Sequence, residues 1–377
     1  MRLTARRLNR ATLARQLLLG REPLEVTEGV RRVVALQAQE AASPYLALWN
    51  RLAPFDPAGL DAAFADHAVI KATLMRITLH AVAAADYPPF HRAMVESLRA
   101  SRLYDRRYKQ TGLTAADADA LIPHLLEYTA ERRTNAECAA LLNARLGADQ
   151  PRAWWALRTF APVVHAVTGG PWSFGYRPSY LAAPLLDQAP DGPEACVQRL
   201  AWRYLEGFGP ASAADLARFT LLTRSAAREA LDAMAGRLER LEGPDGGVLF
   251  DVPGAPRPSE DTPCPPRLMA MWDSVLLAYA DHSRIIPAAY RALVTRRNGD
   301  VLPTLLVDGH VAVVWRPAGG GIEVTSFHQI SERAWQELSD EAGALVSFLA
   351  ARDPAVYRRY THWWKELPAA EVRVLPG

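Results

Sequence analysis

The chain has 377 residues, of which 50% are hydrophobic and 22% charged, so it can bury large cores and is neither disordered nor fibrous. Its length predicts two or three domains of ordinary size. No apolar run approaches the roughly 18 residues of a membrane helix. The Arg-rich residues 1–20 lack the apolar core of a signal peptide. We therefore expect a cytoplasmic protein that does not associate with membranes.

The net charge is only +2, but almost all of the 43 cationic residues are arginines, since only Lys71, Lys109 and Lys365 are lysines. Arginine binds phosphate with two parallel hydrogen bonds and stacks on aromatic rings. A GC-rich genome produces the same bias. A DNA-binding surface must therefore come from local clustering of arginines rather than from the overall charge.

Several classes of enzyme are excluded by missing motifs. The sequence contains no Gly-Lys-Ser/Thr, no G-x-G-x-x-G after a strand, no G-x-S-x-G and no H-E-x-x-H. The nine histidines are scattered, and the three cysteines are too far apart for a disulfide framework or a zinc site. We expect neither a metal ion nor any other cofactor.

Residues 1–110 are predicted to form the first of three similar modules. Thr27 predicts the start of a helix over residues 28–36. Ser43 and the proline after it predict a second helix over residues 45–52. Two strands should follow, over residues 69–73 and 76–82.

Residues 111–190 repeat this order of elements. Thr134 and Glu137 form a capping box, and Gly147 is placed to end that helix. Pro151 stands at the favoured first position of the next helix. Residues 163–168 and 172–176 then read as two strands around the Gly169-Gly170-Pro171 turn.

Residues 191–255 form the third copy, in which Ser212 and Thr223 cap two helices and residues 238–241 and 248–252 predict a hairpin. Two helices joined by a short turn and followed by a β-hairpin are typical of a winged helix-turn-helix. The three copies predict an α+β protein with three tandem winged helices.

The pattern changes in residues 262–377, which follow a Pro-rich linker. Strands are expected over residues 304–307 and 310–316, joined by the two-residue turn Asp308-Gly309, and over 322–327. Ser331 then caps a helix that runs to about Arg352. This part should be a β-meander or small barrel with a terminal helix.

Two glutamines are the first candidates for a functional site. Gln37 and Gln39 stand two residues apart, at the predicted turn of the first helix-turn-helix. In an extended segment residues i and i+2 lie on one side, so both amides can point into one cleft. An amide is neutral at every pH and offers an acceptor and two donors. Such a pair can hydrogen-bond a water molecule or the edge of a nucleobase, but it cannot act as a strong proton acceptor. A solvated loop is the alternative interpretation.

Four motifs occur in order along the chain: LQAQ at 36–39, MRITLH at 75–80, MWDSVLLA at 271–278 followed by DHSR at 281–284, and LVDGHVA at 306–312. In this order they resemble the AlkZ/YcaQ family of bacterial DNA glycosylases over nearly the whole chain. The Gln-x-Gln version is similar to the branch that protects producers of the crosslinking agent azinomycin, whereas Gln-x-Asp is found in the housekeeping branch.

The resemblance implies tandem winged helices wrapped into a C-shaped scaffold with a C-terminal β-domain. It implies a monofunctional enzyme that hydrolyses the N-glycosidic bond of N7-alkylated purines in double-stranded DNA, including bulky adducts and interstrand crosslinks. By match to the family motif, Gln37 and Gln39 become the catalytic pair. No cofactor is implied, and we expect a monomer.

Four further residues are candidates for contacts with DNA or the lesion. Thr78 and His80 alternate on one predicted strand, and their place in the family motif puts them beside the glutamines; a lone histidine on an apolar strand is also often structural. Ser43 lies directly downstream of the glutamines. Asp273 is interpreted either as a buried orienting carboxylate or helix cap, or as a lesion contact.

A hairpin tip completes the candidate site. Arg316, Gly319 and Gly320 belong to a flexible turn that is small enough to enter a DNA groove. A plain β-turn is the alternative.

Two other functions remain open from the sequence. Winged helices most often read the major groove with their second helix, as transcription regulators do. In the first module that helix is nearly all apolar, which weakens this interpretation there. A resistance protein that sequesters the free alkylating agent without catalysis is the second alternative.

Overall fold

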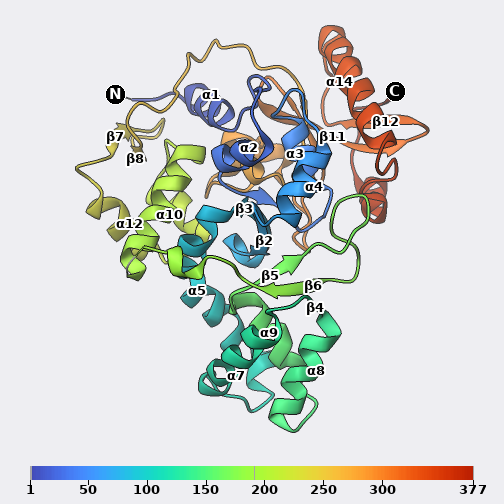
Figure 1. Cartoon of the computed structure of the whole chain (residues 1–377). Coiled ribbons are helices and arrows are strands. Elements are labelled where there is room, and N and C mark those ends of the chain that lie inside the picture. Colours follow the sequence, from blue (N-terminus) through green and yellow to red (C-terminus); the bar gives the residue numbers. More distant parts are fainter. Residues whose placement is uncertain (1, 191, 377) are drawn as a thin grey trace.

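The computed structural model describes residues 2–190 and 192–376 and shows three successive groups of helices and strands followed by a larger sheet (Figure 1). The first group contains α1 (Ala5–Arg15), α2 (Val26–Val33), β1 (Leu36–Gln37), α3 (Ser43–Trp49), α4 (Pro57–Ala65), β2 (Val69–Thr73) and β3 (Leu79–Ala83). The next elements are α5 (Tyr87–Leu103), α6 (Arg106–Lys109), α7 (Ala115–Tyr128), β4 (Arg133–Thr134), α8 (Asn135–Leu146), α9 (Pro151–Phe160), β5 (Val163–Ala166) and β6 (Ser179–Ala182).

The third group and the C-terminal part follow. They contain α10 (Pro193–Phe208), α11 (Ala213–Thr220), α12 (Arg224–Ala233), β7 (Glu239–Glu242), β8 (Val248–Asp251), β9 (Arg267–Leu268), α13 (Arg291–Val294), β10 (Thr304–Val307), β11 (His310–Ala318), β12 (Gly321–Ser326), α14 (Glu332–Ala350) and β13 (Glu371–Leu375). In Figure 1, α7, α8 and α9 lie together at the lower end, α10 and α12 lie on the left, and α14 lies on the right.

Each group ends in a small antiparallel sheet. The strand orders are β1-β3-β2, β4-β6-β5 and the two-stranded β7-β8. The predicted mixture of helices and strands is confirmed. The description of the three groups as winged helices, and the division at residues 110, 190 and 255, stay predictions.

The C-terminal sheet is an open meander. Its strand order is β13-β12-β11-β10-β9, so consecutive strands are neighbours throughout. Asp308 and Gly309 form the tight turn between β10 and β11, with φ of 48° and 81°. The described strands do not close on themselves, so the barrel alternative was wrong and the meander was right.

Most predicted helix ends are confirmed because their side chains make the expected bonds. Thr134 and Glu137 form the capping box of α8, and Gly147 ends that helix at φ 64°. Ser212, Thr223 and Ser331 cap α11, α12 and α14 through side-chain acceptors. These local signals are therefore retained in the folded chain.

Four local predictions were wrong. The strand predicted over residues 76–82 begins only at Leu79, because residues 75–77 form a 3₁₀ turn. The helix predicted to start after Thr27 begins at Val26, and its cap position, Glu25, makes no side-chain bond. Ser43 is the first residue of α3 rather than its cap, because its hydroxyl bonds elsewhere. Residues 172–176 form no strand, because Trp172 packs on Tyr45 and Ser173 bonds to it, and β5 pairs with Ser179–Ala182 instead.

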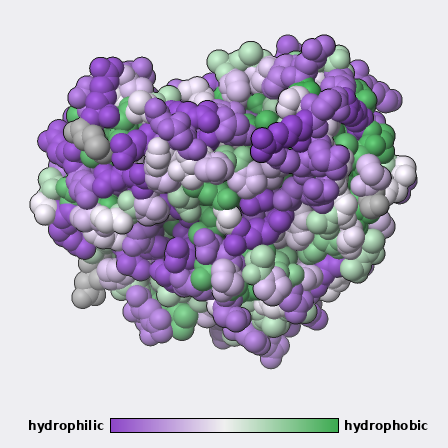
Figure 2. All heavy atoms as spheres, turned by 90° about the horizontal axis from the view of Figure 1, so that it is seen from above, coloured by the Kyte–Doolittle hydropathy of each residue, from purple (hydrophilic) through white to green (hydrophobic). Residues whose placement is uncertain are grey.

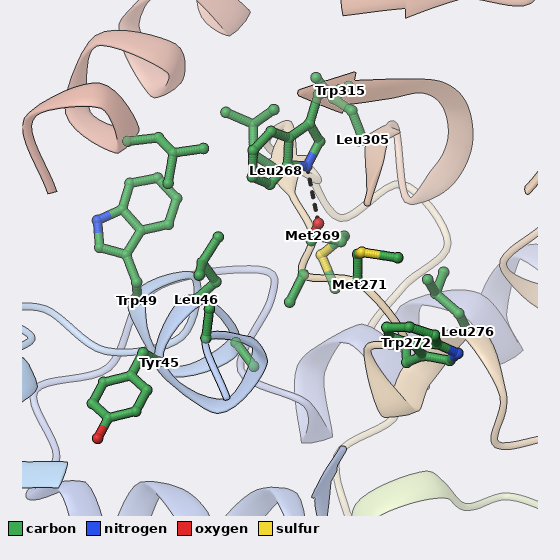
Figure 3. Packing of buried hydrophobic residues seen from close by; sticks show 14 of the residues in the cluster. Tyr45, Leu46, Trp49, Leu268, Met269, Met271, Trp272, Leu276, Leu305 and Trp315 are labelled. Carbon is green, nitrogen blue, oxygen red and sulfur yellow. Dashed lines mark hydrogen bonds between the residues drawn. The ribbon is translucent and has the colours of Figure 1, made fainter. Parts of the chain in front are cut away.

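Two large hydrophobic cores cross the boundaries of the groups. One joins the first group to the C-terminal sheet and α14, and the other joins it to the second and third groups. Figure 3 shows the first of these cores, where Trp49 and Leu46 of α3 face Leu268 and Trp315, whose indole N–H donates to the Met269 carbonyl at 2.9 Å. Every residue of α3 is buried. The first group therefore serves as the shared centre of the molecule.

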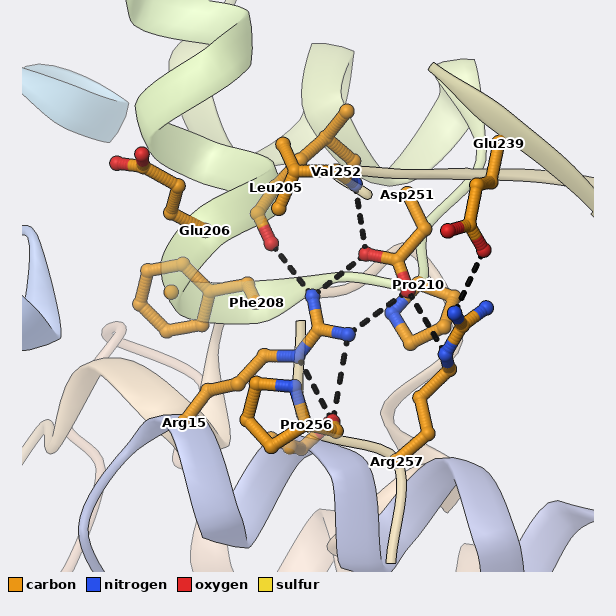
Figure 4. Close-up of polar contacts among 12 residues, drawn as sticks. Arg15, Leu205, Glu206, Phe208, Pro210, Glu239, Asp251, Val252, Pro256 and Arg257 are labelled. Atoms are coloured by element: carbon orange, nitrogen blue, oxygen red, sulfur yellow. Dashed lines mark hydrogen bonds and ion pairs between the residues drawn. The ribbon is translucent and has the colours of Figure 1, made fainter. Parts of the chain in front are cut away.

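Buried ion pairs tie distant segments together. Figure 4 shows Arg15 of α1 donating to both oxygens of Asp251 at 2.7 and 2.8 Å and to the Leu205 carbonyl at 2.8 Å. Removal of one partner of such a pair strongly destabilises the folded protein, because the other charge stays buried and unpaired. By contrast, the face in Figure 2 is mostly hydrophilic, with apolar residues in small separate patches.

Candidate active site

The two glutamines lie at the end of a short strand rather than in a plain turn. Gln37 is the last residue of β1 and pairs in register with His80 of β3. The next backbone N–H, that of Ala38, donates to the Leu79 carbonyl at 2.8 Å and extends the pairing by one residue. This extra strand was not predicted. It fixes Gln37 at the edge of the sheet, and Gln39 lies in the bend that follows, so that a shared face of the two amides stays a prediction.

A local hydrogen bond couples the two glutamines. The Oε1 of Gln37 accepts the backbone N–H of Gln39 at 2.8 Å. Gln37 is only 2% exposed, whereas Gln39 is exposed. The Gln37 carbonyl is thereby fixed in direction and keeps one lone pair for another donor. The arrangement presents one rigid and one accessible amide.

His80 is held as a neutral ring beside Gln37. Its Nδ1 lies 3.1 Å from the Thr78 carbonyl, which can only accept, so Nδ1 carries the proton. Its Nε2 is then an acceptor, 3.3 Å from Nη2 of Arg76. Burial, and then the charge of Arg76, lower the pKa of His80 to about 3. A histidine in this state is a poor base and carries no charge near neutral pH.

Glu40 was missed by the sequence analysis, although it directly follows the glutamines. Its Oε1 accepts from the Tyr360 hydroxyl at 2.7 Å and from Arg359. Both donors belong to the 3₁₀ segment Arg358–Glu366. The loop that carries Gln39 is therefore anchored to the C-terminal part of the chain.

The other predicted residues separate into those near the glutamines and those elsewhere. Thr78 immediately precedes β3, and its hydroxyl donates to the Met75 carbonyl at 3.0 Å. Ser43 is buried and its Oγ lies 3.0 Å from the Tyr357 hydroxyl, so it joins α3 to the C-terminal part. Asp273 is buried and bonds to Arg51 at 2.8 and 2.9 Å. It also accepts from the Val275 N–H at 3.1 Å. Asp273 thus caps the 3₁₀ turn Ser274–Leu276 and pairs with Arg51, and its contact with the lesion stays a prediction.

The hairpin tip lies on the C-terminal sheet. Arg316 bonds to both oxygens of Glu323 at 2.7 and 2.8 Å, and Gly319 and Gly320 form the turn between β11 and β12, with φ of 59° and 81°. One cavity of about 460 Å³ is lined by Arg316 and Trp364 among others, and one of about 430 Å³ by Gly319, Gly320 and Val346 among others. Both cavities border the hairpin, and among the described residues Arg316 makes its ion pair with Glu323 and no hydrogen bond to either glutamine.

Among residues 2–190 and 192–376, no group of three or more His, Cys, Asp and Glu side chains is arranged to hold a metal ion. No helix in the same part of the chain combines the length and the apolar character needed to cross a bilayer.

Comparisons with known proteins identify the fold and the family. The chain is similar to the solved structure of the Streptomyces sahachiroi DNA glycosylase AlkZ, with a TM-score of 0.79 and 19% sequence identity over 94% of this chain and 99% of that one. A search of curated proteins finds no significant match. The family model described as "DNA glycosylase AlkZ-like" matches residues 30–348, a stretch that includes both glutamines and β3. The chain therefore belongs to the AlkZ-like DNA glycosylase family.

Proposed function

We propose that this DNA glycosylase removes N7-alkylated purines, including bulky adducts and interstrand crosslinks, from double-stranded DNA, with Gln37 and Gln39 as the catalytic pair. The proposal includes self-resistance to azinomycin-type agents. The observation that carries it is the hydrogen bond of 2.8 Å from the backbone N–H of Gln39 to the side-chain oxygen of Gln37, which fixes that amide beside a neutral His80.

The chemistry of the lesion matches these groups. Alkylation at N7 places a positive charge on the purine, so the base leaves as a neutral molecule and needs no strong acid. What remains is to place a water below C1′ and to stabilise the positive charge that develops on the sugar. Amide oxygens are suited to both tasks, because their partial negative charge is already oriented when the substrate binds.

The surroundings of the glutamines support this assignment over base-assisted hydrolysis. With its pKa lowered to about 3, His80 has little tendency to accept a proton from water. Glu40 is occupied by Tyr360 and Arg359. The exposed amide of Gln39 is left as the group best placed to meet a substrate.

The burial of α3 argues against a transcription regulator that uses the first module. A helix that reads the major groove must present side chains to base edges. All residues of α3 are buried, from Ser43 to Trp49, so this helix has no face for a groove.

Three oligonucleotide duplexes test the proposal, one with a single N7-methylguanine, one with an N7-linked interstrand crosslink and one unmodified. We expect the free alkylated base and an abasic site from the first two and no release of unmodified purines. Tight binding without free base would favour a regulator or another non-catalytic DNA-binding protein. Binding of the free alkylating agent without any action on the duplex would favour a sequestering protein, and either result would contradict the proposal.

A further inference from the structure

The turn that leads into β3 is held in an unfavourable backbone conformation. Arg76 and Ile77 have φ of 55° and 60°, so two consecutive residues with side chains occupy the left-handed region. There the Cβ atom crowds the backbone, and Ile77 is branched at that atom. Strain of this kind persists where the surroundings impose it, and it is concentrated at functional sites.

The guanidinium of Arg76 has no anionic partner among the described residues. Its Nη2 lies 3.3 Å from the neutral His80 and its carbon lies 5.0 Å from the centre of the Phe219 ring. Its Nη1 is buried without a hydrogen-bond partner. Unpaired buried charges are costly, so an arginine in this state is prepared for an anion that arrives with a ligand.

Arg76 is half-buried, and the fully buried arginines differ from it in having a carboxylate partner. Arg51 is paired with Asp273, Arg15 with Asp251 and Arg203 with Asp86. Each of these pairs joins two elements of the fold, so their charges serve the structure. The lack of a carboxylate partner therefore distinguishes Arg76 from these three arginines.

A second cation points to the same place. Arg218 is exposed on α11, the helix that also supplies Phe219, and it makes no ion pair with any described carboxylate. Burial, and then the charge of Arg218, lower the pKa of Arg76 to about 9. The helix α11 packs against the 3₁₀ turn Met75–Ile77 that carries Arg76, and the repulsion between two neighbouring like charges is relieved by an anion bound near both.

The position of this pair relates it to the glutamines. Arg76 contacts His80, and His80 pairs in register with Gln37. A negative group bound by Arg76 would therefore lie close to the catalytic pair without occupying it. In DNA the phosphodiester groups on either side of a nucleotide are the anions nearest to its glycosidic bond.

We infer that Arg76 and Arg218 form a binding site for the DNA backbone phosphate next to the nucleotide whose base is removed. The inference rests on the proposed function. Bound there, the phosphate holds the sugar so that C1′ faces Gln37 and Gln39, while the positive charges stay on the phosphate rather than beside the sugar cation. Arg218 supplies the exposed first contact, and Arg76 fixes the position.

Duplexes in which one phosphate is replaced by a neutral methylphosphonate test the site. Each phosphate flanking an N7-methylguanine is replaced in turn, and single-turnover excision is measured with the wild type and with Arg76→Asn. Asparagine accepts the left-handed region, so the turn can keep its shape without the guanidinium. We expect the wild type to slow roughly 10- to 100-fold at one position, the scale of a lost charge-assisted hydrogen bond. Arg76→Asn should be slower by a similar factor on the normal duplex and should lose nothing more at that position.

The control variant is Arg237→Asn, which removes an arginine stacked 4.7 Å from the ring centre of Trp202. It should respond to the methylphosphonates as the wild type does, and melting temperatures verify that both variants are folded. Equal slowing of the wild type and Arg76→Asn at every position would overturn the inference, as would a wild-type rate for Arg76→Asn on the normal duplex.

A binding measurement separates this inference from the proposed function. Duplexes that carry a tetrahydrofuran abasic analogue and the same methylphosphonates have no base to remove. Their affinities for the wild type and for Arg76→Asn show whether the effect of the missing phosphate depends on Arg76, which we call the coupling. If the coupling appears in binding while no alkylated base is ever released, the phosphate site is supported and the proposed function is contradicted. If the alkylated base is released but no coupling appears, the proposed function is supported and the phosphate site is contradicted.

Discussion

At the scale of single residues, the catalytic proposal depends on groups that do not titrate. Gln37 and Gln39 are neutral amides, and the one histidine beside them is held neutral by burial and by Arg76. The chemistry of the site is therefore set by fixed dipoles rather than by proton transfer from a side chain.

This arrangement predicts a flat pH dependence. The pKa of His80 is lowered to about 3, so the ring stays neutral between pH 5.5 and 7.5, and Lys71, with its pKa lowered to about 8, keeps most of its charge in this window. Single-turnover excision of N7-methylguanine should therefore vary by less than about 2-fold in this window. A rise in rate centred near pH 6.5 would mean that a histidine with an ordinary pKa acts as the base.

The exposed glutamine should tolerate a carboxylate. Gln39→Asp places a negative charge where positive charge develops on the sugar, and the same group can accept a proton from water. We expect this variant to keep substantial excision of N7-methylguanine, whereas Gln39→Ala should lose roughly 10²- to 10³-fold, by analogy with deleted oxyanion donors. Because Gln39 is exposed, both variants should melt within a few degrees of the wild type. Equal loss in the two variants would show that the amide itself is required.

The sequence identified the glutamines by motif but could not identify their surroundings. Arg76 stands inside one of the motifs, yet its unpaired state depends on the left-handed turn and on Phe219, which is far away in the chain. Glu40 is adjacent to Gln39, but its partners Tyr360 and Arg359 are distant in sequence. Contacts of this kind follow from the packing of separate segments, which local patterns do not contain.

At the scale of elements, buried ion pairs fix how helices and strands meet. Arg51 follows α3, and Asp273 precedes the 3₁₀ turn Ser274–Leu276. Both side chains are almost completely buried. This pair holds the first group against the segment that leads into the C-terminal sheet.

Asp273→Ala should therefore affect stability far more than chemistry. Removal of one partner leaves the Arg51 charge buried and unpaired, which typically costs about 3–5 kcal/mol of unfolding free energy. Denaturant titration measures this loss. The double variant Arg51→Met/Asp273→Leu should recover much of it, because a buried pair can be replaced by apolar groups at little cost. A variant that stays stable but loses lesion binding would restore Asp273 as a lesion contact.

Lys71 on β2 gives a second prediction, with a defined sign. It is 6% exposed, its Nζ lies 4.1 Å from the centre of the Phe174 ring, and burial lowers its pKa to about 8. Between pH 8 and the usual lysine pKa near 10.5 the unfolded chain holds a proton that the folded chain has released. The contribution of Lys71 to stability therefore rises with pH in this window.

Lys71→Met should reveal this dependence. Near pH 7 the variant should be more stable than the wild type by about 1–3 kcal/mol, because it buries no charge. The difference should shrink towards pH 10, which denaturant titrations at several pH values can follow. A constant difference across that range would mean that Lys71 stays charged in the folded protein.

Elements with local signals were predictable, and elements that depend on tertiary packing were not. The capped helices α8, α11, α12 and α14 and the Asp308-Gly309 turn were identified from a few adjacent residues. The supposed strand at residues 172–176 instead supplies Trp172 to the core around Tyr45. The short strand β1 is formed only because β3 offers it a free edge.

At the scale of the whole molecule, many arginines serve the fold rather than a partner. Several pair with buried carboxylates, and others stack on aromatic rings. The arginines therefore fall into two kinds, those that stabilise the fold and those that are available to bind DNA, although the net charge is only +2. Arg76 also lies over the Phe219 ring, but neither Arg76 nor Arg218 has a carboxylate partner among the described residues, so we assign both to the second kind.

The central claim is that the two glutamines release an alkylated base from DNA. The most direct measurement is chromatographic detection of free N7-methylguanine, together with the abasic site left behind, in single turnover with the wild type and with Gln37→Ala/Gln39→Ala. We predict release by the wild type, and a rate at least about 10²-fold lower for the double variant at unchanged DNA affinity. Equal release by both proteins, or none by a folded wild type that binds the duplex, would contradict the account.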